Sequence, residues 1–257
     1  MTAETNLKVM TYNVRYATAP DGANAWPNRR EALLALVKKH DPDVLGVQEA
    51  LSSQIDEIQA VLPDHERVGV GRDDGLRKGE YSALFTRRSK LGLREGGTRW
   101  ISDEPLKPGS LAPGARITRV FAWGEYFLAD GRRVLIMGCH LDHESNEARL
   151  MGARHMRAFA ESRPDLPCII LGDFNCSFVS QPIDAMLAGN QFSACKPANG
   201  PFGTFTAFKP EDVNGPMIDH IFIDKRWSQV SAEIDRTLVE GRTPSDHFPV
   251  IARISLK

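Results

Sequence analysis

The chain has 257 residues, of which 42% are hydrophobic and 25% are charged. This composition is that of a globular protein with a large core, and it excludes a disordered, collagen-like or disulfide-stapled chain. The 32 lysines and arginines nearly balance the 33 aspartates and glutamates, so the net charge is −1. Proteins that coat nucleic acid usually carry a basic excess, because phosphate neutralisation supplies most of their non-specific affinity. A protein that coats nucleic acid is therefore disfavoured.

The four cysteines show no CxxC spacing, and Cys139 and Cys168 lie within strongly apolar runs. Neither a structural zinc site nor a disulfide framework is therefore expected. No stretch approaches about 18 consecutive apolar residues, so no transmembrane helix is expected. Residues 1–8 hold no apolar segment behind a basic start, which predicts a cytoplasmic protein unless a leader has been removed. Nothing in the sequence indicates an obligate protein partner.

The N-terminal part of the chain predicts strand, helix, strand and helix in turn. Residues 7–12 are β-branched and aromatic, and residues 28–40 carry apolar side chains on one helical stripe after a proline. Residues 44–48 are apolar enough for a buried strand, and apolar side chains then recur at helical spacing over 51–62. Glu49 therefore stands at the carboxyl end of a strand.

Between residues 65 and 140 the helical period gives way to short alternating runs, which predict a β-rich region. Residues 102–113 hold three prolines and no periodicity, which indicates a surface loop rather than an interdomain linker. A helix is expected at 147–161. No internal repeat is visible, so we predict one compact α/β domain with two sheets over residues 1–257. Strands from the middle onward are expected at 82–85, 120–128, 134–139, 168–171, 217–223 and 248–254.

Several predicted strands share a second feature, because a carboxylate, an amide or an imidazole follows the apolar run at once. Strand ends are rigid, so side chains placed there hold a constellation with little reorganisation. Converging carboxylates need a cation or bound protons to relieve their repulsion. The residues at these strand ends are Asn13, Glu49, His140, Asp173, Asn175, Asp219 and His220, and Asp246 and His247 directly precede the last apolar run.

Carboxylate and amide oxygens without thiolates favour a hard cation such as magnesium, which takes one or two protein carboxylates and keeps several waters. Asn13 and Glu49 suit such a cation. A phosphate ester bound there would have its charge neutralised by the metal and by imidazolium or amide donors. Hydrolysis also needs a group that orients or deprotonates water, and Asp173 offers one two residues before the amide of Asn175.

Seven fragments carry a family resemblance: TYNVR, QE, GEYSALF, GCHLDH, GDFN, IDHIFID and SDHFPV stand in this order between residues 11 and 250. Each fragment alone is weak, since a tetrapeptide such as GDFN occurs by chance. The ordered set resembles the endonuclease/exonuclease/phosphatase superfamily, which includes deoxyribonuclease I. The resemblance covers nearly the whole chain. It implies a four-layered αββα sandwich with the site at one edge of the paired sheets.

The resemblance also implies roles for the matched residues. The metal, Mg²⁺ or Mn²⁺, would be bound by Asn13 and Glu49, with Asp246 as a further ligand. Asp173 would position or deprotonate the attacking water, and Asn175 would bind the scissile phosphate.

Two histidines would contact that phosphate from opposite sides. His247 would have Asp219 as its carboxylate partner, and Glu80 would orient His140 as in the deoxyribonuclease branch. A carboxylate on one ring nitrogen fixes the tautomer and favours the protonated imidazole.

The pocket around these groups is expected to be specific to this chain. His220 stands where many relatives have an aromatic residue, and the segment Phe205-Thr206-Ala207 stands where a histidine is common. Both departures are expected to alter the substrate pocket. Further substrate-binding candidates come from fragments that resemble a bacterial subgroup of the superfamily, namely Arg72, Arg119, Asp142 and His143.

Each residue also has a purely structural interpretation. Asn13 alone would satisfy a turn, and Glu49 alone would cap the following helix. The ordered motif set favours the functional interpretation for both. His40 and His65 have no partner motif and are expected at the surface.

The predicted function is hydrolysis of a phosphodiester or phosphomonoester by in-line attack of water, without a covalent enzyme intermediate. A small substrate is favoured because the sequence shows no basic arm or aromatic-rich insertion for a long polymer. One alternative is a magnesium-dependent nuclease acting on DNA or RNA. Another is a non-catalytic binding module, which the retained glutamate, GDFN pair and final histidine disfavour. A hydrolase of other esters is disfavoured because no GxSxG motif is present.

Overall fold

The structure is a computed structural model and describes residues 5–257. Residues 1–4, part of the stretch in which no leader is predicted, lie outside the described residues. The helices are α1 (Trp26–His40), α2 (Ser52–Val61), α3 (Asn146–Glu161) and α4 (Gln181–Leu187), with short 3-10 turns η1 (Gly22–Asn24) and η2 (Ala188–Asn190). The strands are β1 (Thr5–Asn13), β2 (Val44–Ala50), β3 (His65–Val68), β4 (Tyr81–Arg87), β5 (Leu91–Trp100), β6 (Val120–Leu128), β7 (Arg133–His140), β8 (Cys168–Asp173), β9 (Phe192–Ala194), β10 (Asp219–Asp224), β11 (Trp227–Ile234) and β12 (Val250–Leu256).

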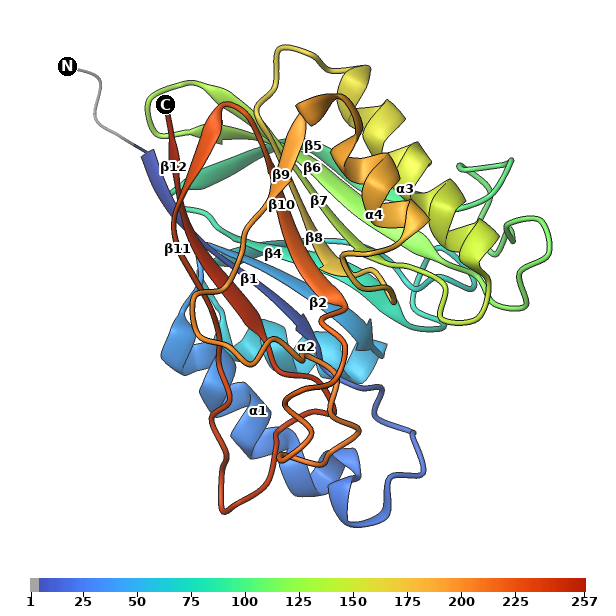
Figure 1. Ribbon diagram of the computed structural model, residues 1–257, viewed down its shortest axis with the longest axis vertical. Coiled ribbons are helices and arrows are strands. Elements are labelled where there is room, and N and C mark those ends of the chain that lie inside the picture. The colour runs from blue at the N-terminus through green and yellow to red at the C-terminus, as the bar shows by residue number, and fades with distance from the viewer. Residues whose placement is uncertain (1–4) are drawn as a thin grey trace.

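The strands form two six-stranded mixed sheets that pack face to face (Figure 1). The first sheet has the order β11-β12-β1-β2-β4-β3, and the second has the order β5-β6-β7-β8-β10-β9. Helices α1 and α2 cover the outer face of the first sheet, and α3 and α4 cover that of the second. The predicted four-layered αββα sandwich is confirmed.

Three apolar clusters fill the interfaces between these layers. The cluster between the sheets joins Val9 of the first sheet to Leu171 of the second. Met156 belongs to the cluster beneath α3 and α4, and Leu33 belongs to the cluster beneath α1 and α2. All four side chains are fully buried. Removing this apolar surface from water is the main driving force that holds the layers together.

Strand pairing brings the polar strand ends to one edge of the sandwich. In the first sheet β1 and β2 are parallel neighbours, so Asn13 and Glu49 leave it at the same end. In the second sheet β7 and β8 are parallel, with His140 opposite Asp173. Strand β10 runs antiparallel to β8 and begins with Asp219 opposite Asp173. The topology therefore gathers side chains that lie far apart in the sequence.

Gly172 allows β8 to approach β7 closely just before Asp173. A Cβ atom at this position would lie 2.1 Å from the carbonyl oxygen of Cys139, and the φ of Gly172 is +153°. Any other residue would push the two strands apart, because backbone atoms cannot move aside as a flexible side chain can. The glycine thus fixes where Asp173 leaves the sheet.

The sequence does not predict β9, β11 or α4, and it predicts no bounds for β3 and β5 within the β-rich region. Strand β11 lies at a sheet edge with mostly exposed or half-buried side chains, so it lacks the apolar run of a buried strand. Helix α4 has seven residues and β9 has three, which is too short for a periodic signal. The strand predicted at 217–223 begins at Asp219 instead.

The prediction that His40 and His65 lie at the surface is wrong. His40 Nε2 lies 2.6 Å from Asp235 Oδ2, and His65 Nε2 lies 2.7 Å from the carbonyl oxygen of Pro42. Both rings are buried, and a partner from another segment lies at hydrogen-bond distance from the Nε2 atom of each ring.

Among the described residues, every helix is too short or too polar to cross a membrane. The predicted cellular location remains a prediction.

Candidate active site

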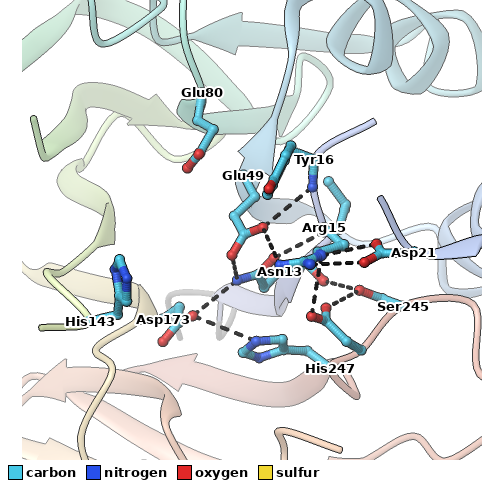
Figure 2. Close-up of polar contacts among 12 residues, drawn as sticks. Asn13, Arg15, Tyr16, Asp21, Glu49, Glu80, His143, Asp173, Ser245 and His247 are labelled. Carbon is cyan, nitrogen blue, oxygen red and sulfur yellow. Dashed lines mark hydrogen bonds and ion pairs between the residues drawn. The ribbon is translucent and has the colours of Figure 1, made fainter. Parts of the chain in front are cut away.

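The amide of Asn13 links the two sheets at the centre of the site (Figure 2). Its Nδ2 donates to Glu49 Oε1 and to Asp173 Oδ2, both at 3.0 Å. Ser245 Oγ donates to the carbonyl oxygen of Asn13 at 2.7 Å. Because Asn13 is fully buried, its amide fixes the spacing of two carboxylates that come from different sheets.

Glu49 and Asn175 adopt the left-handed backbone conformation, with φ of 64° and 49°. Side chains other than glycine seldom hold this conformation unless the surroundings impose it, and such strain is concentrated at functional sites. At Glu49 the pairing of β2 with β4 is irregular between Gln48 and Ala50. The irregularity turns Glu49 out of the strand ladder, so that its side chain faces the site.

The carboxylate of Asp173 lies between two imidazoles. His140 Nε2 and His247 Nε2 are 3.5 Å and 3.8 Å from Asp173 Oδ2. Its other oxygen accepts a hydrogen bond from the backbone N–H of Asn175 at 2.8 Å. Burial raises the pKa of Asp173 to about 7, and the Asp219 carboxylate adds to this effect against the opposing charge of His247. An aspartate with this pKa exchanges its proton near neutral pH.

His247 and Asp219 form the histidine–carboxylate pair that the sequence predicts. His247 Nδ1 lies 2.8 Å from Asp219 Oδ2. Burial alone would lower the pKa of His247, but the carboxylates of Asp219 and Asp173 outweigh burial and raise the pKa to about 10. The imidazole is therefore protonated at neutral pH, and its Nε2–H lies on the side of Asp173.

His140 is paired with a guanidinium rather than with a carboxylate. Arg119 Nη1 lies 2.8 Å from His140 Nδ1, whereas Glu80 Oε2 lies 3.9 Å from the same nitrogen. Glu80 instead accepts a hydrogen bond from Arg72 Nη1 at 2.6 Å. Arg119 rather than Glu80 therefore lies at hydrogen-bond distance from this ring nitrogen, and the orienting role of Glu80 stays a prediction. Burial, followed by the charge of Arg119, lowers the pKa of His140 well below its usual value.

These groups line a cavity of about 470 Å³. The structure brings together most of the residues predicted for the site. In its wall are Glu49, Arg72, Glu80, Arg119, His140, His143, Asp173, Asn175, Asp246 and His247. The wall also contains Phe205, the first residue of the segment 205–207. Four further residues of the wall are not predicted from the sequence: Arg15, Tyr16, Ile117 and Ile218.

Arg15 is the missed residue with the clearest sequence signal, because it closes the fragment TYNVR. Its guanidinium binds both carboxylate oxygens of Asp21, at 3.0 Å and 2.9 Å. Arg15 Nε also lies 3.6 Å from Asp246 Oδ2. Figure 2 shows the side chain of Arg15 between Asp21 and the centre of the site. Asp21 thus holds the positively charged guanidinium of Arg15 at the cavity wall.

Two residues expected near the substrate do not line the cavity. Asp142 Oδ1 accepts the backbone N–H groups of Glu144 and Ser145 at 2.8 Å and 2.7 Å, which shapes the turn before α3. His220 Nε2 lies 2.9 Å from the carbonyl oxygen of Cys176. Asp142 therefore stabilises the turn before α3, and His220 holds the loop at Cys176. Neither side chain lines the cavity as expected.

The acidic groups of the site suit a hard divalent cation. The carboxylates of Glu49, Asp173 and Asp246 line one cavity, and no cysteine joins them among the described lining residues. Burial raises the pKa of Asp246, as it does that of Asp173. Asp219 Oδ1 is buried without a hydrogen-bond partner in the described chain, and Asp219 lies in a buried acidic cluster with Asp173 and His247. Carboxylates that converge in this way are stabilised by a cation with oxygen ligands.

The order of these motifs and their geometry agree with the family comparison. Residues 10–247 match the Endonuclease/Exonuclease/phosphatase family. The chain belongs to this family. A solved endonuclease/exonuclease/phosphatase family protein from Bacteroides thetaiotaomicron is 32% identical, with a TM-score of 0.93 over 99% of both chains. A mannosyl-6-phosphatase from Bacteroides thetaiotaomicron is also 32% identical, with a TM-score of 0.89 over 96% of this chain and 99% of the other.

A curated relative gives the same family signal at lower identity. Nocturnin from Drosophila melanogaster is 25% identical over 190 residues, which cover 69% of this chain. The chain matches only 28% of the length of that relative. As a member of the endonuclease/exonuclease/phosphatase family, the protein is a phosphoric ester hydrolase, which confirms the predicted enzyme class.

Proposed function

We propose that the protein hydrolyses a small phosphate ester with water in a reaction that depends on Mg²⁺ or Mn²⁺, and that the substrate is a sugar phosphomonoester. The placement of Asp173 carries the proposal. This carboxylate, with a pKa of about 7, lies between protonated His247 and neutral His140 in a cavity shared with Glu49. A phosphate bound there meets donors on two sides and a base for the attacking water.

The side chains of the chain itself account for the proton transfer. The oxygen of the attacking water bonds to phosphorus, and the water proton passes to Asp173. The ester P–O bond breaks, and the departing sugar oxygen takes up a proton from solvent. The cation on His247 faces the charge that develops on the phosphate oxygens. Asn175 Nδ2 donates one hydrogen to the carbonyl oxygen of Leu141 at 3.0 Å, which leaves its second hydrogen for the phosphate.

We assign Glu49 and Asp246 to the metal. Asn13 would hold Glu49 in place through its Nδ2, since its Oδ1 accepts the backbone N–H of Arg15 at 3.0 Å. A divalent cation bound there neutralises phosphate charge as a Lewis acid.

Three observations support a small substrate. The cavity of about 470 Å³ is in the size range that takes one small molecule. The net charge of −1 gives no general attraction to a polyanion. The relative described as a mannosyl-6-phosphatase aligns with nearly the whole chain.

The proposal is tested by measuring phosphate release from hexose 6-phosphates and nucleoside monophosphates with Mg²⁺ or Mn²⁺, beside nicking of supercoiled plasmid and cleavage of RNA. We expect turnover of at least one sugar phosphate and no efficient cutting of either polymer. Efficient cutting at sub-stoichiometric enzyme, without phosphate release from any small ester, would instead make the protein a nuclease.

A further inference from the structure

The side chain of Arg119 lies between two histidines of the site. Arg119 directly precedes β6, and its side chain is only 6% exposed. Its Nη1 lies 2.8 Å from His140 Nδ1, and its Nη2 lies 3.1 Å from His143 Nδ1. One guanidinium therefore contacts the same ring atom of both imidazoles.

This contact determines where the protons of His140 reside. A guanidinium carries five N–H donors and no acceptor, so the nitrogen that faces it must present a lone pair. His140 Nδ1 is therefore unprotonated, and the ring proton is on Nε2. Protonating Nδ1 as well would point an N–H at the N–H of Arg119. The imidazole is held neutral, with its single donor on the Nε2 side, 3.5 Å from Asp173 Oδ2.

The carboxylate of Glu80 forms an ion pair with Arg119 and helps to hold it in this position. Glu80 Oε2 lies 3.6 Å from Arg119 Nη1 and also accepts from Arg72 Nη1 at 2.6 Å. His143 and Glu80 lie on the same side of the site as Asp173 in Figure 2. The charged and titratable groups that face His140 are Glu80, Arg72, Arg119, His143, Asp173 and His247.

We propose that Arg119 is a positioning residue that fixes His140 as a neutral imidazole with its hydrogen on Nε2. The consequence rests on the proposed function. Asp173 then has a neutral imidazole, His140, as its neighbour at 3.5 Å. A cation at that position would stabilise the Asp173 carboxylate and weaken it as a base for water. The arrangement also presents a fixed N–H donor to the phosphate.

The direct test is the tautomer of His140 in the metal-free wild-type protein, read by ¹⁵N chemical shifts of its ring nitrogens in long-range NMR spectra. The His140→Gln variant identifies the signal. We expect an unprotonated Nδ1 and a protonated Nε2 throughout the range between about pH 5.5 and 8. A proton on Nδ1, or an imidazolium in this range, would overturn the proposal. This readout does not depend on any activity.

Two variants separate positioning from direct phosphate binding. Arg119→Met removes the donors and keeps an unbranched apolar stem, and Arg119→Lys restores a positively charged donor group. We expect His140 to titrate in Arg119→Met, and its Nδ1 to remain unprotonated to a greater extent in Arg119→Lys. An unchanged His140 tautomer in folded Arg119→Met would overturn the proposal, and circular dichroism establishes that the variant is folded.

The kinetics give a second distinction. Positioning predicts that Arg119→Met lowers kcat by about tenfold or more, with KM and inhibition by inorganic phosphate changed by less than about threefold. It also predicts a partial recovery of kcat in Arg119→Lys. A direct phosphate ligand would instead raise KM and the phosphate inhibition constant by about tenfold, and that result would overturn the proposal. If no ester is turned over, the function proposed above fails, while the NMR result still decides the role of Arg119.

Discussion

Among the carboxylates that the structure describes in the site, only that of Glu49 is held at a strained backbone position and also contacts the Asn13 amide. Because this geometry aims its oxygens into the cavity, Glu49→Gln should weaken metal binding and raise the Mg²⁺ concentration for half-maximal activity by roughly 10–100-fold. Isothermal titration with Mn²⁺ and activity titrations with Mg²⁺ measure the effect. Glu31→Gln, at a side chain that is 82% exposed, is the matched control. Equal metal requirements in the two variants would refute the ligand role of Glu49.

The pair of His247 and Asp219 predicts a pH dependence of stability. The folded pKa of His247 is about 10 and the unfolded value is about 6.5, so the folded state holds this proton more tightly. The stabilisation is fully present below pH of about 6.5 and is lost as the pH rises through about 10. In Asp219→Asn the main source of the raised pKa is gone. The difference in free energy of unfolding between metal-free wild type and Asp219→Asn should therefore shrink from pH 7 to 10.

Urea unfolding at several pH values measures this difference. A gap that stays constant over that range would show that His247 is not protonated in the folded protein.

The residues of the site differ in how far the sequence predicts them. Asp173, Asn175 and His247 belong to fragments that are recognisable on their own, and the structure brings them together. The partner of His140 is not predictable in this way, because Arg119 reaches it only through the pairing of β6 with β7. Asp142 follows a strand end as the site residues do, yet its side chain turns to the backbone before α3.

At the scale of elements, alternation along β10 places Asp219 and His220 on opposite faces. His220 lies among Phe174, Phe178 and Phe222, with Nε2 2.9 Å from the carbonyl oxygen of Cys176. The donor therefore ties β10 to the loop that follows Asn175. This contact explains why a polar residue is tolerated in an aromatic cluster.

Replacing this donor should affect both stability and catalysis. His220→Phe keeps an aromatic ring, though a larger one, and leaves the Cys176 carbonyl without this donor, so we expect about 1–3 kcal/mol of destabilisation. We also expect a lower kcat through displacement of Asn175, with the metal requirement unchanged. His155→Phe, at a half-buried ring on α3, is the control. A His220→Phe enzyme with wild-type kcat and stability would show that this hydrogen bond has no role.

Elements with a buried face are the ones that the sequence predicts. The fully buried β8 and the apolar stripe of α1 have strong periodic signals, and both appear close to the predicted bounds. Strand β11 and helix α4 are stabilised by tertiary contacts rather than by a local sequence pattern, so the sequence alone does not predict them. The short β3 lies at a sheet edge, and its form likewise depends on tertiary pairing rather than on a local pattern.

At the scale of the whole molecule, the sandwich makes one site from two sheets. Asn13 and Glu49 come from the first sheet, and His140, Asp173 and Asp219 come from the second. The amide of Asn13 is the hydrogen-bonded bridge between the carboxylates of the two sheets. Catalysis should therefore depend on the packing of the whole sandwich as well as on the groups of the site.

The most direct test of this account is turnover of p-nitrophenyl phosphate and bis(p-nitrophenyl) phosphate with Mg²⁺, Mn²⁺ or chelator. Wild type, Asp173→Asn and the control Asp142→Asn are compared in parallel. We expect metal-dependent turnover that chelator abolishes. Asp173→Asn should lose at least about a thousandfold in kcat while still binding metal and inorganic phosphate, because its amide cannot accept the water proton. Asp142→Asn should retain activity, since an amide oxygen still accepts the two backbone N–H groups. Near wild-type kcat in folded Asp173→Asn would contradict the role of Asp173 as the base for water. Wild-type turnover that is insensitive to chelator would contradict metal-dependent hydrolysis.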